Sequence, residues 1–255
     1  MNNKIKKVQS FFDNDASRYL NERYHGTSCE HISYLTRKRI VIDFLKKLSG
    51  TVLDVGCGPA IFTKELVEMN FQIYSVDLSF NMLKKAKIIS NSNKNLFWAN
   101  SQIEELPFVD NVFDVIICIG VITYSKNTIK ALREIARILK PGGTIIIQCS
   151  NSLAPTPYIV SLKDYFLFIL RLRKNKLEFD LRRVSFKRFK SMLADLNVQV
   201  EQVSRYDYRL PFIEKFFPKT ATRLMIFLQL HLEKSNMFGW FAEGYVLRAS
   251  KNVEY

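Results

Sequence analysis

The residues best suited to chemistry lie in one short segment, Asp54-Val55-Gly56-Cys57-Gly58, and in an acid that follows it. Glycine has no Cβ, so a turn built on Gly56 and Gly58 can be tight and lets a ligand approach the backbone closely. Asp77 stands 19 residues after Gly58, at the end of the next apolar segment. Carboxylates in that place hydrogen-bond ribose hydroxyls. Together these residues predict a site for a ligand that carries an adenosine group.

Asp54 discriminates between two classes of such ligands. Dinucleotide folds seat a pyrophosphate with the pattern GxGxxG, whereas here the turn continues Gly58-Pro59-Ala60-Ile61, without a third glycine. An acid two residues before Gly56 would repel a pyrophosphate, but it could order the turn or pair with an ammonium group. The pattern therefore favours S-adenosylmethionine, which has a ribose and an α-amino group and no phosphate.

The elements that must position these residues alternate between strand and helix from about residue 35 to residue 150. Strands are predicted at Thr51–Val55, Gln72–Val76, Asn95–Trp98, Val112–Ile119 and Gly143–Gln148, and helices at Tyr34–Leu48, Ile61–Met69, Asn81–Ile89 and Thr128–Leu139. Several strands are apolar throughout, as in sheets that helices cover on both faces. Lys140–Gly143 is expected to end the last helix and to turn the chain. This repetition predicts an α/β fold with a doubly wound, mostly parallel sheet.

The pattern changes after Cys149. We expect one domain over residues 1–255, in which lid helices in 1–48 precede a cofactor-binding core in 49–150. Two helical cap insertions are expected in 151–190 and 207–240, with a strand at 198–206 between them and a last strand in 241–250. In the helix predicted at Tyr34–Leu48, an apolar stripe faces the core and basic residues lie opposite; the stripe comprises Leu35, Ile40, Val41, Phe44, Leu45 and Leu48.

The charge of the chain favours an anionic partner, because 38 Lys and Arg against 24 Asp and Glu leave a net charge of +14. Between Lys163 and Lys190, ten Lys and Arg stand against three Asp and Glu, interleaved with aromatic residues. This segment is expected to be a solvated helix face; the alternative is a surface that meets a membrane or a lipid-linked acceptor. The apolar stretches fall short of the ~20 residues of a membrane span. The four cysteines form no CxxC pair, so we expect no metal, and a cytoplasmic protein that is peripheral at a membrane at most.

Five motifs carry a resemblance to a known family: VLDVGCGPAIFT, SVDLS, IEELPF, FDVIICIGVITY and LREIARILKPGGTIII, in this order. They resemble the class I S-adenosylmethionine-dependent methyltransferases, nearest to the small-molecule branch that includes ubiquinone and menaquinone biosynthesis methyltransferases. The resemblance covers roughly residues 11–150, with a weaker echo in 241–250. It implies a Rossmann-like methyltransferase fold with a seven-stranded sheet, and S-adenosylmethionine as the cofactor. It also implies methyl transfer to a small or lipid-linked metabolite, which we expect at oxygen.

The resemblance implies roles for the residues at the methionine and ribose ends of the cofactor. Asp54, Gly56 and Gly58 would line the methionine end. Asp77 would hold both ribose hydroxyls, and Leu78 would pack on the adenine.

Five further residues would complete the cofactor site by the same resemblance. Gln102 stands where the family usually has Asp, and its amide oxygen would accept from the adenine amine. The backbone amide of Ile103 would meet the ring, and the carbonyl of Cys118 would accept from the cofactor's amino group. Tyr19 and Tyr24 are the candidates for an N-terminal aromatic residue that closes over the cofactor.

The chemistry needs few catalytic groups. Methyl transfer from a sulfonium is an in-line displacement, so alignment and exclusion of water supply much of the acceleration. A hydroxyl acceptor additionally needs a base, and His25 and His31 in the expected lid are the candidates, against a reading of both as ordinary polar lid residues. Tyr124 follows the fourth strand, where it would contact the acceptor or simply pack. His231 lies in an apolar stretch and is assigned a structural role.

Two other function classes compete with a small-molecule enzyme. The charge suggests a nucleic-acid methyltransferase acting on RNA, but Cys118-Ile119-Gly120-Val121 lacks the Asn/Asp-Pro-Pro-aromatic motif that enzymes methylating base amines use. A non-catalytic scaffold with this fold is disfavoured because Asp54, Gly56, Gly58 and Asp77 are all present. The acceptor, its atom and the oligomeric state stay open at this stage.

Overall fold

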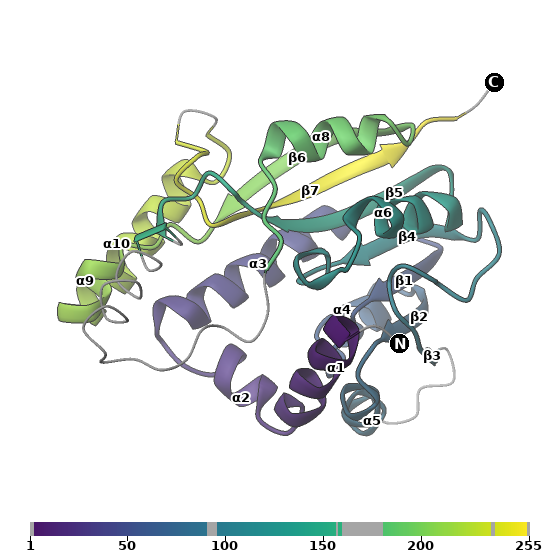
Figure 1. The fold of residues 1–255 in the computed structure, drawn as a ribbon, viewed down its shortest axis with the longest axis horizontal. Coiled ribbons are helices and arrows are strands. Elements are labelled where there is room, and N and C mark those ends of the chain that lie inside the picture. Colours follow the sequence, from purple (N-terminus) through teal and green to yellow (C-terminus); the bar gives the residue numbers. More distant parts are fainter. Residues whose placement is uncertain (1–2, 91–95, 157, 160–180, 236–237, 254–255) are drawn as a thin grey trace.

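The computed structural model describes residues 3–90, 96–156, 158–159, 181–235 and 238–253 (Figure 1). Its described strands form one seven-stranded sheet in the order β3-β2-β1-β4-β5-β7-β6. The strands are β1 Thr51–Val55, β2 Gln72–Asp77, β3 Leu96–Asn100, β4 Phe113–Cys118, β5 Leu139–Ser150, β6 Val198–Tyr206 and β7 Gly244–Lys251. β1 to β5 pair in parallel, and β7 runs antiparallel to β5 and β6. The predicted doubly wound, mostly parallel seven-stranded sheet is confirmed.

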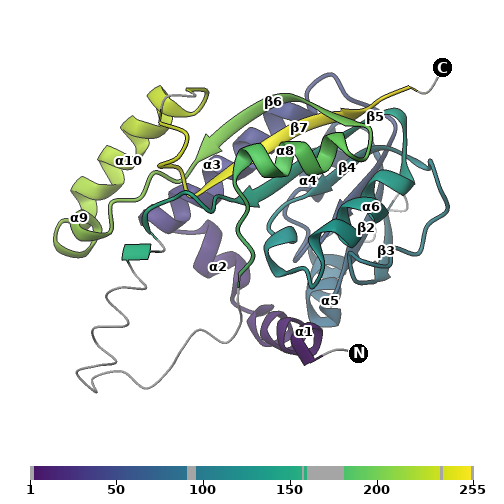
Figure 2. The same ribbon diagram turned by 45° about the horizontal axis from the view of Figure 1, so that its top comes forward.

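Helices cover both faces of this sheet (Figures 1 and 2). The described helices are α1 Asn3–Asp15, α2 Tyr19–Tyr24, α3 Cys29–Leu45, α4 Thr63–Glu68, α5 Phe80–Ile89, α6 Thr128–Ile138, α8 Phe186–Ala194, α9 Pro211–Phe216 and α10 Pro218–Leu232, with a 3₁₀ turn at Ile122–Tyr124. Side chains of α6 and α8 form one hydrophobic core with the sheet, and side chains of α3 and α4 form another.

The all-apolar strands of the sequence follow from this two-sided cover. Successive residues of a strand point to opposite faces, and in β1 Val52 packs in the core of α3 and α4 whereas Leu53 and Val55 pack in the core of α6 and α8. All three side chains are buried. A strand with two buried faces therefore shows no alternation in its sequence.

The helix before β1 differs from the prediction in its start and in its buried stripe. It begins at Cys29, because the side chain of Ser28 accepts a hydrogen bond from the backbone N–H of His31 and caps the helix there. Leu35, predicted to lie in the apolar stripe, is 42% exposed. Val41 and Phe44 are buried as predicted.

The turn predicted at Lys140–Gly143 lies inside a strand. β5 begins at Leu139, directly after α6, and its pairing with β4 shifts register between Phe113 and Val115. Gly142 sits in this irregularity with φ of 76°, a backbone conformation that glycine adopts without steric cost. The glycine pair therefore bends the strand instead of preceding it.

The last residues of the expected cap range 151–190 belong to a helix that packs on the sheet. α8 starts at Phe186 and packs on the sheet, where Phe189 and Leu193 are buried beside Tyr245 of β7. The remaining basic segment lies largely outside the described residues, since 160–180 are not described. α9 and α10 lie together beyond one end of the sheet (Figure 1). In the part of the chain that the structure describes, each helix is too short or too polar to cross a bilayer.

Candidate active site

The glycine turn after β1 is tied to the neighbouring strand. The backbone N–H groups of Gly56 and Cys57 donate to the carbonyl of Val76 at 2.7 and 3.1 Å. Gly56 and Gly58 have φ of 69° and 53°, which explains why the turn uses glycine. A Cβ on Gly56 would lie 2.1 Å from Cγ2 of Val121, whereas a Cβ on Gly58 would meet no atom within 4 Å. Gly58 therefore faces open space, as a ligand cradle requires.

Asp77 closes this turn from the end of β2. Its Oδ2 accepts from the N–H of Gly58 at 2.8 Å and its Oδ1 accepts from the N–H of Ser79 at 2.8 Å. Burial raises the pKa of Asp77 to about 6, although these backbone donors favour the ionised form. A carboxylate oxygen can accept more than one hydrogen bond, so both oxygens retain capacity for ribose hydroxyls.

Asp54 is a buried carboxyl with an unsatisfied oxygen. Asp54 is 1% exposed, and its Oδ2 has no hydrogen-bond partner among the described residues. Burial, followed by the charge of Asp77, raises the pKa of Asp54 to about 8. An unpaired buried polar group costs free energy, and a ligand ammonium group at this place would supply the missing partner. The donor and acceptor set of the turn thus fits S-adenosylmethionine.

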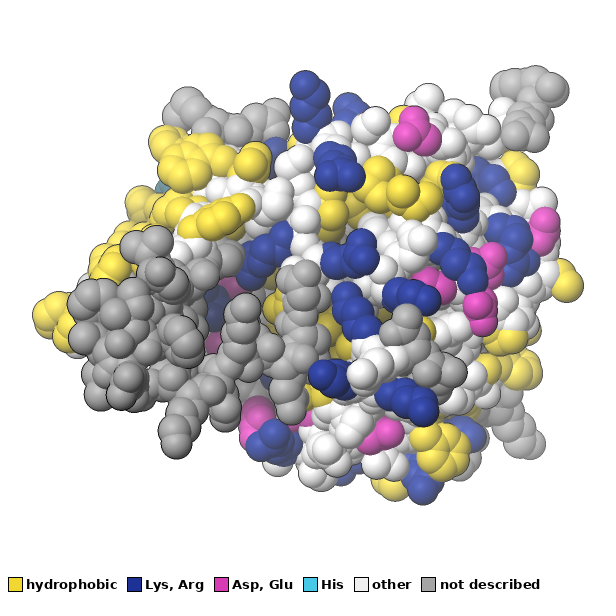
Figure 3. Space-filling view, viewed as in Figure 1, with side chains coloured by type: hydrophobic (Ala, Val, Ile, Leu, Met, Phe, Trp, Pro, Cys, Tyr) yellow, Lys and Arg dark blue, Asp and Glu magenta, His cyan; other side chains and the backbone are white. Residues whose placement is uncertain are grey.

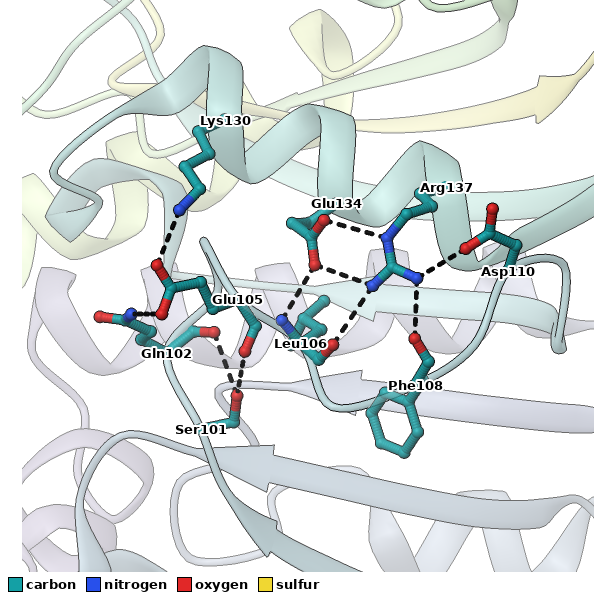
Figure 4. Close-up of polar contacts among 9 residues, drawn as sticks. All are labelled: Ser101, Gln102, Glu105, Leu106, Phe108, Asp110, Lys130, Glu134 and Arg137. Atoms are coloured by element: carbon teal, nitrogen blue, oxygen red, sulfur yellow. Dashed lines mark hydrogen bonds and ion pairs between the residues drawn. The ribbon is translucent and has the colours of Figure 1, made fainter.

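The loop after β3, on the adenine side of the predicted site, is held by side chains of α6 (Figure 4). Nε2 of Gln102 donates to Oε2 of Glu105 at 2.7 Å, and Glu105 pairs with Lys130 at 2.7 Å. The amide oxygen of Gln102 takes no part in these contacts and points away from them (Figure 4). It keeps the acceptor capacity that the prediction assigned to it.

Arg137 and Glu134 of α6 fix the next part of this loop (Figure 4). Oε2 of Glu134 accepts from the N–H of Leu106 at 3.1 Å, and Nη1 of Arg137 donates to the carbonyl of Phe108 at 2.8 Å. Ile103, between Gln102 and this clamp, is buried. The loop that was predicted to line the adenine is therefore anchored by one helix.

Asn100 is a positioning residue that the sequence reasoning missed. Its Nδ2 donates to the carbonyls of Asp77 and Leu78 at 2.9 Å each, which ties the end of β3 to the end of β2. Cys118, at the end of β4, is fully buried and pairs with Val55 in the sheet register, so its backbone lies beside the glycine turn. The contact of its carbonyl with the cofactor's amino group stays a prediction.

The first helix docks close to the acid of the ribose end. Oδ1 of Asp13 accepts from Oγ of Ser79 at 2.6 Å and from the N–H of Asn81 at 3.1 Å. Ser79 in turn caps α5 by accepting from Met82. α1 is therefore attached to the start of α5 and to its cap Ser79, which lies two residues beyond Asp77.

The tyrosines predicted to close over the cofactor lie in an aromatic cluster. The ring centroids of Tyr19 and Tyr24 are 6.5 Å apart, and those of Tyr24 and Tyr34 are 5.5 Å apart. The guanidinium of Arg23 stacks over the ring of Tyr19 at 4.2 Å and pairs with buried Asp15 at 2.6 Å. We call these five residues the lid cluster.

The three predicted catalytic residues lie in different surroundings. The ring of Tyr124 packs edge-on against Phe12 of α1 at 5.1 Å, and burial raises its pKa, so its hydroxyl stays protonated at neutral pH. Nδ1 of His31, in the first turn of α3, lies 2.5 Å from Oγ of Ser28, the cap of that helix. His25 is exposed at the end of α2. The assignment of either histidine as a base stays a prediction.

The comparisons with known proteins relate the chain to methyltransferases. A family profile described as a methyltransferase domain matches residues 53–147. The chain is 30% identical over 174 residues to a demethylmenaquinone methyltransferase of Staphylococcus haemolyticus, covering 66% of this chain and 71% of the relative. It is 30% identical over 148 residues to a malonyl-[acyl-carrier protein] O-methyltransferase of Legionella pneumophila, covering 57% of this chain and 49% of the relative.

The fold is also similar to that of a solved methyltransferase. The magnesium protoporphyrin IX methyltransferase of Synechocystis, solved with bound S-adenosylhomocysteine, matches with a TM-score of 0.67 over 97% of this chain and 99% of that chain. The sequence identity of 12% makes this a likeness of fold alone. With the turn, its two acids and the sheet order in place, the chain belongs to the class I S-adenosylmethionine-dependent methyltransferases, and S-adenosylmethionine is its cofactor.

Proposed function

We propose that this enzyme moves the methyl group of S-adenosylmethionine to an oxygen of a small or lipid-linked metabolite. The observation that carries the proposal is the meeting of three features at one sheet edge: the open cradle at Gly58, the carboxylate of Asp77 and the unsatisfied carboxyl of Asp54. Bound S-adenosylmethionine supplies an electrophilic methyl group on a sulfonium.

The chain's own residues would bind and orient the two substrates. Asp54 pairs with the ammonium group and the glycine turn holds the methionine end. Asp77 takes the ribose hydroxyls, while Leu78, Gln102 and Ile103 enclose the adenine. The carbonyl of Cys118 accepts from the amino group. The lid cluster and α1 exclude water from the reacting atoms, and alignment of this kind is worth up to ~7–11 kcal/mol.

Two relatives support the class of acceptor. One is named for demethylmenaquinone and the other for malonyl-[acyl-carrier protein] and for transfer to oxygen. Tyr124 contacts the acceptor in this proposal and positions it by its protonated hydroxyl. His25 or His31 would take the proton of a hydroxyl acceptor.

An exposed aromatic surface supports an acceptor held at a lipid surface. Hydrophobic side chains gather at the end of the molecule formed by α9 and α10 (Figure 3), and more than half of each of the following is exposed: Phe212, Phe216, Phe217, Phe227 and Leu230. The same two helices carry Lys215, Lys219 and Arg223. Apolar side chains beside basic ones are typical of helices that lie on an anionic membrane surface.

Vesicle flotation tests this surface. We expect the protein to float with vesicles of phosphatidylglycerol and phosphatidylcholine, and Phe212→Ser with Phe216→Ser to reduce the bound fraction several-fold. Ile88→Ser is the matched control, since Ile88 is exposed on α5. Equal flotation of the control and the double variant would remove the lipid-surface argument.

The proposed function is tested by cofactor titration and by metabolite analysis. Calorimetry should show binding of S-adenosylhomocysteine, and extracts of cells that make the protein should contain a metabolite that gains a methyl mass. Cells that make Asp77→Ala provide the control extract. RNA that gains the methyl group, together with steeply salt-dependent RNA binding, would favour the nucleic-acid alternative instead.

A further inference from the structure

Arg37 of α3 lies at the end of β4, beside the glycine turn. Its Nη1 is 3.7 Å from the position of a Cβ on Gly120, two residues after Cys118. The next residue, Val121, is the one that a Cβ on Gly56 would touch. The guanidinium of Arg37 therefore sits at the sheet edge to which the methionine end of the cofactor is assigned.

The surroundings of Arg37 are aromatic. Its guanidinium stacks over the ring of Tyr34 at 4.6 Å, and its charge acts on the hydroxyls of Tyr24 and Tyr206. Burial raises the pKa of Tyr24, and it raises the pKa of Tyr206 to about 12. Both hydroxyls are therefore neutral at physiological pH, so they do not balance the charge of Arg37.

Arg23, the arginine of the lid cluster, differs from Arg37 in having an ion-pair partner. Arg23 has a carboxylate partner, Asp15, at 2.6 Å. Among the described residues, Arg37 makes no ion pair within 4.0 Å. A partly buried charge that lacks an opposite charge costs free energy. A planar guanidinium also matches a carboxylate in two parallel hydrogen bonds.

We propose that Arg37 binds a carboxylate of the methyl acceptor, which makes the acceptor an organic acid with an aromatic or apolar body. The tyrosines of the lid cluster would pack on that body, and the carboxylate would balance the charge of Arg37 beside the transferred methyl group. This inference rests on the proposed methyl transfer, because it places the acceptor opposite the cofactor.

The test uses paired probes that differ in charge alone. Each pair is an acid and its amide: phenylacetate with phenylacetamide, and octanoate with octanamide. The compounds are titrated into the protein saturated with S-adenosylhomocysteine, and ligand-observed NMR detects weak binding. We expect at least one acid to bind ten-fold or more tightly than its amide. Arg37→Met should abolish this preference, and Arg37→Lys should retain part of it.

Arg39→Met is the matched control, because Arg39 is two residues along the same helix, half exposed, and pairs with Asp43 at 3.2 Å. The inference is overturned if acids and amides bind equally, if no acid binds, or if Arg37→Met and Arg39→Met behave alike. Titration of S-adenosylhomocysteine alone separates the two proposals. Binding of that compound without a preference for acids overturns the inference alone, whereas its failure to bind overturns the proposed function as well.

Discussion

Gly56 and Gly58 should respond differently to the same added methyl group. Both have positive φ, so alanine at either position costs about 1–2 kcal/mol of backbone strain. A Cβ on Gly56 would also lie 2.1 Å from Cγ2 of Val121, and relieving such an overlap in a packed site costs about 1–3 kcal/mol more. Gly58→Ala has no such neighbour.

We therefore expect Gly56→Ala to lose about 2–5 kcal/mol of unfolding free energy and Gly58→Ala about 1–2 kcal/mol. For ligand binding we expect the opposite ranking, in which Gly58→Ala is the more damaging variant. The new methyl group of Gly58→Ala fills the cradle, and overpacking of about 1–3 kcal/mol there weakens S-adenosylhomocysteine binding roughly 5- to 150-fold.

Denaturant unfolding and calorimetry measure the two effects separately. Unfolding of each variant without ligand gives the stability loss. Repeating it with ligand at 100 times the wild-type dissociation constant should stabilise the wild type by about 2.7 kcal/mol and Gly58→Ala by much less.

Two results would refute this reasoning. Gly58→Ala with wild-type affinity would mean that the ligand does not approach the backbone at Gly58. Gly56→Ala no less stable than Gly58→Ala would mean that the contact with Val121 carries no energetic weight.

Three further predictions concern the acids around the site. Asp77→Ala should weaken S-adenosylhomocysteine binding by about 1–3 kcal/mol, the cost of leaving polar groups unpaired; calorimetry showing unchanged affinity would contradict the ribose assignment. Burial holds the pKa of Asp54 at about 8 in the free protein, so an ammonium partner that favours its ionised form should release a proton on binding near pH 7, and affinity should rise from pH 6 to pH 8. Equal binding heats in two buffers of different ionisation enthalpy would show that no proton is released. Asp13→Ala should lose about 1 kcal/mol of unfolding free energy, because Ser79 loses its partner, and should expose α1 to proteolysis. Asp43→Ala is the control, because it removes an exposed ion pair and should change the unfolding free energy by less than about 0.5 kcal/mol. Identical digestion of the two variants would show that Asp13 does not hold α1 in place.

The fold and the cofactor end of the site could be predicted from the sequence because both are encoded locally. A strand buried on two faces must be apolar throughout, and a turn with positive φ selects glycine. The strand at Val198–Tyr206 has the predicted bounds. Asp77 meets Gly58 because parallel strands bring their carboxyl ends to one edge.

The places of α1 and α8 depend on contacts between distant segments. Asp13 contacts Ser79, 66 residues further along the chain, and no local sequence pattern predicts that contact. α8 carries basic residues that suggested a solvated cap, yet the packing of Phe189 and Leu193 on the sheet decides its place.

Arg37 illustrates the difference between what the sequence pattern indicates and what tertiary packing decides. The sequence placed it on the basic, solvated side of its helix. Yet it lies three residues after Tyr34 and four before buried Val41, which is the spacing of one helical stripe. That spacing allowed Arg37 to be partly buried, but only the docking of α3 and the lid cluster over the sheet edge determined that it would be. Tertiary packing decides which of two possible stripes is covered, because the free energy of burial depends on the surface that each stripe meets.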